Sequence, residues 1–206
     1  MYNLLDIKPD FRNRENALEI EHFNGDIEFK NVWFAYKEGE WILKDVSFHI
    51  KPKQVVAFVG ATGAGKTTIL QLIVRNYDIQ KGQILIDGID IRDIDIKCLR
   101  RGIGQMLQDV FLFAGSIKSN INLRDDSIPD ADIVEACKYV NADQFIDKLP
   151  KGLDEEVLEG GNNFSSGQRQ LLSFARTVVH HPQILILDEA LSLIHISEPT
   201  RQEAIS

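Results

Sequence analysis

Eight consecutive residues have the types and spacing of a phosphate-binding loop: Gly60, Ala61, Thr62, Gly63, Ala64, Gly65, Lys66 and Thr67. The glycines allow the backbone to wrap closely around a phosphate, so that successive N–H groups point toward it. Lys66 brings a mobile positive charge to the β- and γ-phosphates, and the Thr67 hydroxyl is suited to ligate Mg²⁺. Thr68 follows and is included among the expected nucleotide contacts. The stretch predicts nucleotide binding; the alternative is a glycine-rich turn with a surface lysine.

Two carboxylates follow a short apolar run, Ile184–Leu187. If that run is a strand beside the strand that precedes the phosphate loop, Asp188 reaches the same sheet edge and holds Mg²⁺ through water. Glu189 then faces the γ-phosphate, where it orients or deprotonates the attacking water. Without the upstream loop, the same two residues would be interpreted as a solvated turn.

The phosphate loop must be positioned by a strand before it and a helix after it. Residues 54–60 form a continuous apolar run that ends at a glycine, which is typical of a strand buried on both faces. After the loop, apolar residues recur every three or four positions, which predicts a helix. These residues are Ile69, Leu70, Ile73, Val74 and Tyr77.

Other segments predict the rest of an α/β sandwich. Alternating apolar residues between 27 and 50, and again over 82–91 with a turn at Asp87 and Gly88, indicate an antiparallel layer. Helical spacing marks residues 128–149, with Ile133, Ala136, Cys137 and Val140 on one stripe, and the segment after Ser165. We therefore expect a helical insertion between about 100 and 165.

Composition narrows the class of protein. The chain has 206 residues, a net charge of −8 and 44% hydrophobic residues, as expected of a globular domain. It has no apolar run near the roughly 20 residues of a membrane helix and no recognisable signal peptide. Cys98 and Cys137 indicate neither a disulfide framework nor a zinc site. The acidic balance argues against a nucleic-acid partner.

A further motif, residues 163–168, resembles the Leu-Ser-Gly-Gly-Gln signature of ATP-binding-cassette transporters. Phe164 and Ser166 depart from that pattern. The resemblance, to exporters whose membrane and ATPase parts share one chain, implies a phosphate-loop ATPase fold. Its parts are a RecA-like core, an antiparallel β subdomain and an α-helical subdomain, here without its C-terminal part. It also implies that four residues contact the γ-phosphate bound by an opposing subunit: Ser165, Ser166, Gly167 and Gln168.

The resemblance assigns roles to other positions. Tyr36 matches the aromatic residue that stacks on adenine, with cross-strand packing as the alternative. Gln108 matches the glutamine that reaches Mg²⁺ and takes part in catalysis. Phe111 and Phe113 match a region that receives a helix of the membrane part, with burial in the helical insertion as the alternative. Residues 156–161 resemble an acidic loop described for exporters.

The resemblance also divides the chain. Residues 1–24 resemble the linker from a preceding transmembrane domain, and 25–190 the nucleotide-binding domain. After Ala190 it stops: Leu191–Arg201 reads like a translated adapter from sequencing libraries, so we expect 191–206 to be a non-native tail. His195 lies too close to Glu189 to be the family's switch histidine. A fragment that lacks the later elements is expected to be inactive.

The resulting hypothesis is an ATPase motor domain of an exporter, with ATP and Mg²⁺ as cofactors. Its implied partners are a second nucleotide-binding domain, identical or related, arranged head to tail, and the transmembrane domains of the same chain. Its implied location is the cytoplasmic face of the cell membrane. A soluble cassette ATPase in translation or DNA maintenance is the alternative. Lys66, Asp188 and Glu189 argue against an inert regulatory cassette.

Overall fold

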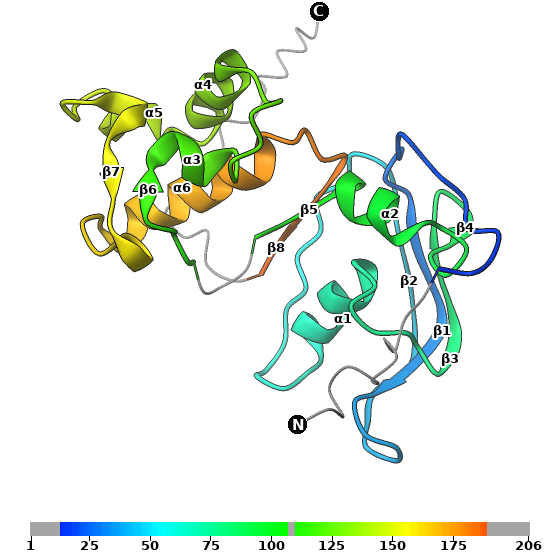
Figure 1. Ribbon diagram of the computed structural model, residues 1–206. Helices are drawn as coiled ribbons and strands as arrows, with labels where there is room; N and C mark the ends of the chain where they lie inside the picture. The colour runs from blue at the N-terminus through cyan, green and yellow to red at the C-terminus, as the bar shows by residue number, and fades with distance from the viewer. Residues whose placement is uncertain (1–12, 107–109, 189–206) are drawn as a thin grey trace, which may run out of the picture. The chain divides into compact units, whose positions relative to one another are not determined.

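The computed structural model describes residues 13–106 and 110–188 (Figure 1). The chain divides into two compact units. The first comprises residues up to Ile103 together with Pro182–Ile186, and the second comprises Gly104–His181 and the residues from Leu187 on. Each unit has its own cluster of buried apolar side chains. No helix in the described ranges combines the length and hydrophobicity needed to cross a membrane.

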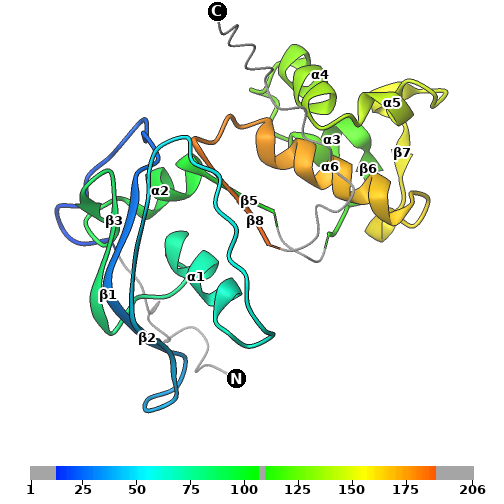
Figure 2. The same ribbon diagram turned by 180° about the vertical axis from the view of Figure 1, so that it is seen from behind.

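The first unit contains a four-stranded sheet, seen from two sides in Figures 1 and 2. Its strands are β1 (Ile27–Ala35), β2 (Trp41–Ile50), β3 (Lys81–Ile86) and β4 (Ile89–Asp90). The order is β2-β1-β3-β4, and every neighbouring pair is antiparallel. Phe29 lies opposite Phe48, with the rings stacked 4.3 Å apart. The predicted antiparallel layer is confirmed.

The predicted turn between β3 and β4 is also present. Asp87 and Gly88 both have positive φ angles, 51° and 80°, which suit a tight hairpin turn. The Asp87 carboxylate accepts hydrogen bonds from the backbone N–H groups of Asn24 (2.7 Å) and Asp26 (3.0 Å). This aspartate therefore also fixes the chain that leads into β1.

Two helices complete the first unit, α1 (Lys66–Ile73) and α2 (Ile96–Gly102). The predicted apolar face of α1 is confirmed for Ile69, Ile73 and Val74, which are buried together with Leu72. Tyr77 lies beyond the end of α1 and is 41% exposed, so its place on that helical face is wrong. Arg75, with a φ of 51°, reverses the chain direction before Tyr77.

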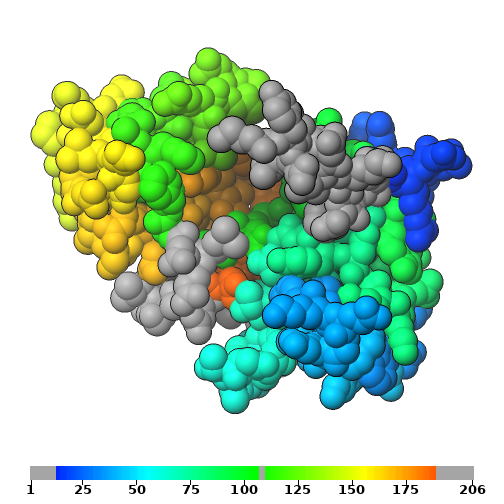
Figure 3. All heavy atoms as spheres, turned by 60° about the horizontal axis from the view of Figure 1, so that its bottom comes forward, coloured from blue at the N-terminus to red at the C-terminus, as the bar shows by residue number. Residues whose placement is uncertain are grey.

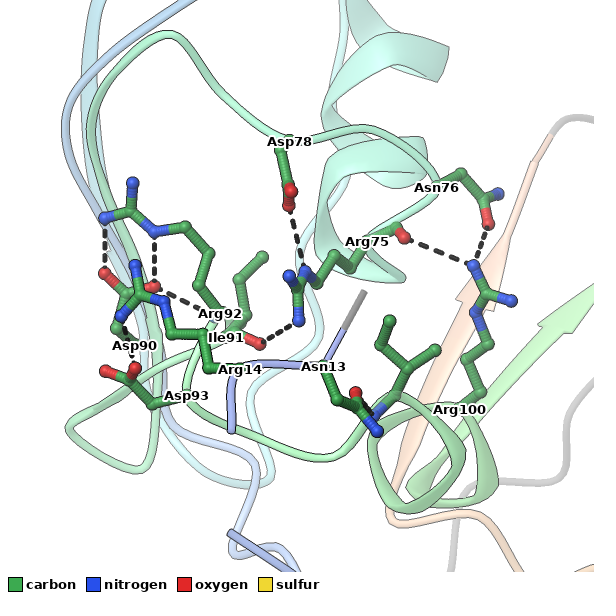
Figure 4. Close-up of polar contacts among 11 residues, drawn as sticks. Asn13, Arg14, Arg75, Asn76, Asp78, Asp90, Ile91, Arg92, Asp93 and Arg100 are labelled. Atoms are coloured by element: carbon green, nitrogen blue, oxygen red, sulfur yellow. Dashed lines mark hydrogen bonds and ion pairs between the residues drawn. The ribbon is translucent and has the colours of Figure 1, made fainter. Parts of the chain in front are cut away.

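A polar network holds the end of α1 (Figure 4). The buried Arg75 side chain donates to the Asp78 carboxylate at 2.9 Å and to the carbonyl oxygen of Ile91 at 3.3 Å. Arg100 of α2 donates to the carbonyl oxygen of Arg75 and to the Asn76 side chain, both at 3.2 Å. The turn that ends the phosphate-loop helix is thus fixed from two sides.

The strand expected over 54–60 is not formed. Val55 is 98% exposed and Val59 is 90% exposed, and residues 54–60 have no strand conformation. A strand buried on both faces needs neighbouring strands, but β8 (Ile184–Leu187) pairs with β5 (Ile103–Met106) instead. The sequence predicted that the strand before Asp188 pairs with the strand before the phosphate loop. Within the described residues, that prediction is wrong. Strand β8 itself is confirmed, although Leu185 is 36% exposed.

The second unit is mainly helical. It contains α3 (Ile117–Ile121), α4 (Asp130–Tyr139), α5 (Asp143–Ile146) and α6 (Ser166–Val178), with α6 packed against α3 and α4. Short strands β6 (Gly115–Ser116) and β7 (Glu156–Val157) pair antiparallel, and 3-10 turns occupy Gly152–Asp154 and Glu159–Gly161. The helical stretch predicted over 128–149 is two helices, because Asn141 has a φ of 58°. The predicted stripe on α4 is buried.

Candidate nucleotide-binding site

The phosphate loop precedes α1 in the first unit. Residues 60–64 are exposed, and this part of the chain, cyan in Figure 3, lies at the surface. Gly63 and Gly65 have φ angles of 84° and 85°, which residues with side chains rarely adopt. At Gly65 a Cβ atom would also lie 2.8 Å from Cδ2 of Leu43. Glycine at 65 is therefore favoured by the backbone turn, and a side chain there would also have to displace the end of the Leu43 side chain.

Lys66 is the first residue of α1, and its side chain folds back over the loop. Its ammonium group donates to the carbonyl oxygens of Gly60 (2.9 Å) and Ala61 (3.0 Å). A positive charge is thereby placed beside the positive end of the helix, a combination that attracts anions. The arrangement fits a nucleotide phosphate, which is a stronger acceptor for the ammonium group than neutral carbonyls.

Tyr36 directly follows β1 and is 50% exposed. Its hydroxyl lies 3.2 Å from the hydroxyl of Thr68, a buried residue in the first turn of α1. The structure thus brings two of the expected nucleotide contacts together. Tyr36 lies outside the ladder of β1 and β2, and its role in stacking on adenine stays a prediction.

The signature segment lies in the second unit and forms the start of α6. Ser165 is the N-cap: its hydroxyl accepts from the N–H of Gln168 at 3.2 Å, and the Gln168 side chain accepts from the N–H of Ser165 at 2.9 Å. This capping box confirms the predicted helix start. Ser166 and Gly167 are the first two residues of the helix, and Ser166 is exposed. Phe164 is buried, which explains how a large aromatic residue is accommodated there.

Asn163 makes a structural contact that the sequence did not indicate. Its amide side chain accepts from the N–H of Leu158 at 3.0 Å and donates to the carbonyl oxygen of Glu156 at 2.7 Å. The acidic loop is therefore attached directly to the residue that begins the signature. Side chain–backbone bridges of this kind have no fixed spacing, so no sequence pattern could have indicated it.

Phe111 and Phe113 are 52% and 54% exposed, and their rings contact each other at 5.2 Å. The alternative of burial within the helical insertion is therefore wrong. Arg176 of α6 donates to the carbonyl oxygen of Phe111 at 3.0 Å and lies over the Phe113 ring at 5.9 Å. Burial lowers the pKa of Arg176. The half-buried Arg176 side chain therefore contacts both residues of the exposed aromatic pair.

The structure says less about the residues expected to bind Mg²⁺ and to activate water. Asp188 follows β8, and its N–H donates to the carbonyl oxygen of Met106 at 3.1 Å. Gln108 and Glu189 lie outside the described residues. In the part of the chain that the structure describes, no cluster of three His, Cys, Asp or Glu side chains is suited to a metal. The phosphate loop and the signature belong to different units, each with its own internal geometry.

The family model described as ABC transporter matches residues 43–192. The chain belongs to the ABC transporter family. It is 47% identical over 191 residues to the probable multidrug resistance ABC transporter ATP-binding/permease protein YheH of Bacillus subtilis (strain 168), covering 92% of this chain and 28% of that protein. It is 40% identical over 206 residues to the ATP-dependent lipid A-core flippase of Syntrophus aciditrophicus (strain SB), covering 100% of this chain and 34% of that protein.

A solved structure supports the same assignment. The structure of a bacterial Atm1-family ABC exporter with ATP bound aligns with a TM-score of 0.86 at 38% identity, covering 91% of this chain and 33% of that one. The expected fold, a phosphate-loop ABC ATPase, is therefore confirmed. This ABC-family chain spans about a third of the length of the relatives it matches.

Proposed function

We propose that this chain is the ATP-binding and ATP-hydrolysing motor domain of an ABC exporter. The observation that carries the proposal is the geometry of Lys66, whose ammonium group bonds to Gly60 and Ala61 at the start of α1. A capped signature helix in the same chain, beginning at Ser165, supplies the second anion-binding element. The relatives named as ATP-binding/permease and flippase proteins favour export over a soluble ATPase in translation or DNA maintenance.

In this proposal each residue has a defined task. Lys66 and the loop backbone bind the β- and γ-phosphates, and Tyr36 stacks on adenine. Thr67, Gln108 and Asp188 would hold Mg²⁺, which would supply positive charge to the phosphates. Glu189 orients or deprotonates the attacking water. Ser165, Ser166, Gly167 and Gln168 bind the γ-phosphate of a nucleotide held by another subunit.

The proposed partners follow from these tasks. The signature and the phosphate loop act on the same nucleotide from two subunits, so a second nucleotide-binding domain, identical or related, binds head to tail. The exposed pair Phe111 and Phe113 supports docking of the membrane domains of the same chain. The protein then works at the cytoplasmic face of the membrane. Residues 1–24 are the proposed linker, and 25–190 the proposed motor domain.

The test is Glu189→Gln in the complete exporter. The amide keeps the shape of the side chain but cannot accept a proton, so ATP binding persists while hydrolysis falls. An ATP-dependent dimer of nucleotide-binding domains then accumulates, which size-exclusion chromatography measures. A phosphate-release assay measures the loss of hydrolysis. Near-normal turnover in the variant contradicts the proposed base.

Residues 191–206 are a separate proposal. We propose that they are translated adapter rather than natural protein, because Leu191–Arg201 reads like such a translation. The coding DNA decides the matter: codons for 191–197 that do not spell the adapter sequence exclude the proposal.

A further inference from the structure

Three aromatic rings meet beside the phosphate loop in the first unit. Phe34 is buried in β1, and its ring lies 4.8 Å from that of Tyr36 at an interplanar angle of 87°. The Tyr77 ring lies 5.0 Å from that of Tyr36 at 83°. Phe34 and Tyr77 are 5.7 Å apart. Tyr36 therefore has edge-to-face contacts with two other rings, a favourable geometry for aromatic pairs.

The Tyr36 side chain is thus restrained at three points. Phe34 and Tyr77 contact its ring, and the Thr68 hydroxyl lies 3.2 Å from its own hydroxyl. Half of the side chain nevertheless remains exposed. A ring that is held before the ligand arrives loses less conformational freedom on binding than a mobile one. The arrangement suits a stacking surface for a planar base.

Tyr77 can act as a restraint because its own backbone is fixed on both sides. Figure 4 shows the two attachments: Arg100 bonds to the Asn76 side chain, and Arg75 forms an ion pair with Asp78. The N–H of Asn76 also donates to the carbonyl oxygen of Gln71 at 2.9 Å. The turn that carries Tyr77 is therefore attached to the end of α1 and to α2. Neither attachment uses the Tyr77 side chain, so that residue can be changed without breaking them.

We propose that Tyr77 is a positioning residue for nucleotide recognition, which holds the Tyr36 ring in the orientation that stacks on the base. The inference rests on the proposed adenine role of Tyr36. This role explains why Tyr77, in the loop after α1, remains 41% exposed while it packs against Tyr36, which is also exposed. The adenine site then consists of a contacting ring, Tyr36, and a supporting ring, Tyr77.

The experiment measures the binding of two probes to the complete exporter: Mg–ATP, and Mg–tripolyphosphate, which has no base. Tyr77→Leu is expected to weaken ATP binding by about 3- to 10-fold and to leave tripolyphosphate binding unchanged. Tyr77→Phe keeps the ring and should bind both probes normally. Tyr139→Leu is the matched control, because Tyr139 is 56% exposed, contacts Phe174 edge to face, and lies in the second unit.

A double-mutant cycle separates positioning from direct contact. If Tyr77 acts through Tyr36, Tyr77→Leu has no further effect in a Tyr36→Leu background. Additive losses overturn the inference, because they mean that Tyr77 contacts the base itself. If Tyr77→Leu weakens the binding of both probes equally, the inference is also overturned, because that result indicates a structural defect. If Tyr36→Leu weakens ATP binding and Tyr77→Leu does not, the inference alone fails. If Tyr36→Leu has no effect, the proposed adenine role fails first.

Discussion

The ammonium nitrogen of Lys66 lies 2.9 Å from the carbonyl oxygen of Gly60, so the loop binds its own cation through its backbone. This contact joins Lys66, near the end of the loop segment, to the residue six positions before it. A phosphate that enters must therefore replace two neutral acceptors, Gly60 and Ala61, with charged oxygens. The exchange is favourable because charge-assisted hydrogen bonds are stronger than neutral ones.

Lys66→Ala is therefore expected to weaken Mg–ATP binding to the complete protein. The lost contact between ammonium and phosphate is worth about 1.5–3 kcal/mol, or roughly 10- to 150-fold in Kd. Isothermal titration calorimetry measures the Kd of Mg–ATP for the variant and the wild type. Lys148→Ala is the control, since Lys148 is an exposed lysine of the second unit. An unchanged ATP affinity for the Lys66 variant is incompatible with the assigned role.

The signature offers a test that separates helix capping from phosphate binding. Ser165→Asp keeps a good N-cap residue, so the free energy of unfolding should change by less than about 1 kcal/mol. The added carboxylate, however, repels the γ-phosphate that this position is proposed to bind, and ATP hydrolysis should fall at least about 10-fold. Denaturant unfolding and phosphate release give the two readouts.

A matched control for this variant exists in the same unit. Ser116 caps α3 through a second capping box with Ser119, at distances of 3.0 and 2.9 Å. Ser116→Asp should leave both stability and hydrolysis nearly unchanged. If Ser165→Asp retains full turnover, the signature does not bind phosphate in the proposed way.

A third prediction concerns Asp90 and Arg92, which form a two-pronged ion pair at 2.9 and 2.6 Å (Figure 4). Burial by itself raises the pKa of Asp90, but the hydrogen bonds and the charge of Arg92 outweigh it and lower the pKa below its ordinary value. The ionised carboxylate therefore stabilises the fold above the unfolded-state pKa of about 4, and this contribution is lost as pH falls through the lowered folded-state pKa.

Asp90→Asn should accordingly reduce the free energy of unfolding at pH 7 by about 1.5–3 kcal/mol. The difference from wild type should shrink as the pH falls below about 4. Urea denaturation at pH 7, 5 and 3 measures this, with Asp126→Asn at an exposed position as control. A difference that is the same at pH 3 and pH 7 would mean that the carboxylate charge does not matter.

The sequence predicted best where packing is local or strictly periodic. Alternation from Ile27 to Ile50 indicated the pairing of β1 and β2, because each strand has one buried face. Apolar residues at helical spacing after Ser165 indicated α6, and the capping pair of Ser165 and Gln168 then marks its start in the structure. The family's motifs indicated Tyr36 as a site residue, now found beside Thr68.

Prediction was poorer where a residue depends on distant partners. The apolar run 54–60 has the composition of a buried strand, but composition does not say which strand pairs with it. Tyr77 fits the spacing of a helical face, yet the positive φ of Arg75 ends that face first. Asn163 and Arg176 act through bonds to backbone groups of other loops, and such bonds leave no periodic pattern.

The apolar run before the phosphate loop is the basis of the last prediction. Val55 and Val59 are almost fully exposed in the described structure, although apolar side chains at such positions normally pack against neighbouring strands. The expectation of a strand over 54–60, which this structure does not form, can be tested in a protein of the relatives' length, where further strands could cover both faces of the segment. The same substitution should then have different effects in the two proteins.

Val59→Asp in the 206-residue chain should change the free energy of unfolding by less than about 0.5 kcal/mol, because the side chain is 90% exposed. In the longer protein the carboxylate would be buried without a partner, at a cost of several kcal/mol, and ATP binding should be lost with the loop geometry. The 206-residue chain itself should release phosphate at least about 100-fold more slowly than the longer protein, since errors of about 1 Å at the chemistry have effects of that size. Val134→Asp on α4 is the control and should behave alike in both. Thermal unfolding and phosphate release on the two proteins side by side decide the question. Small effects of Val59→Asp in both would show that this segment is no buried strand in either.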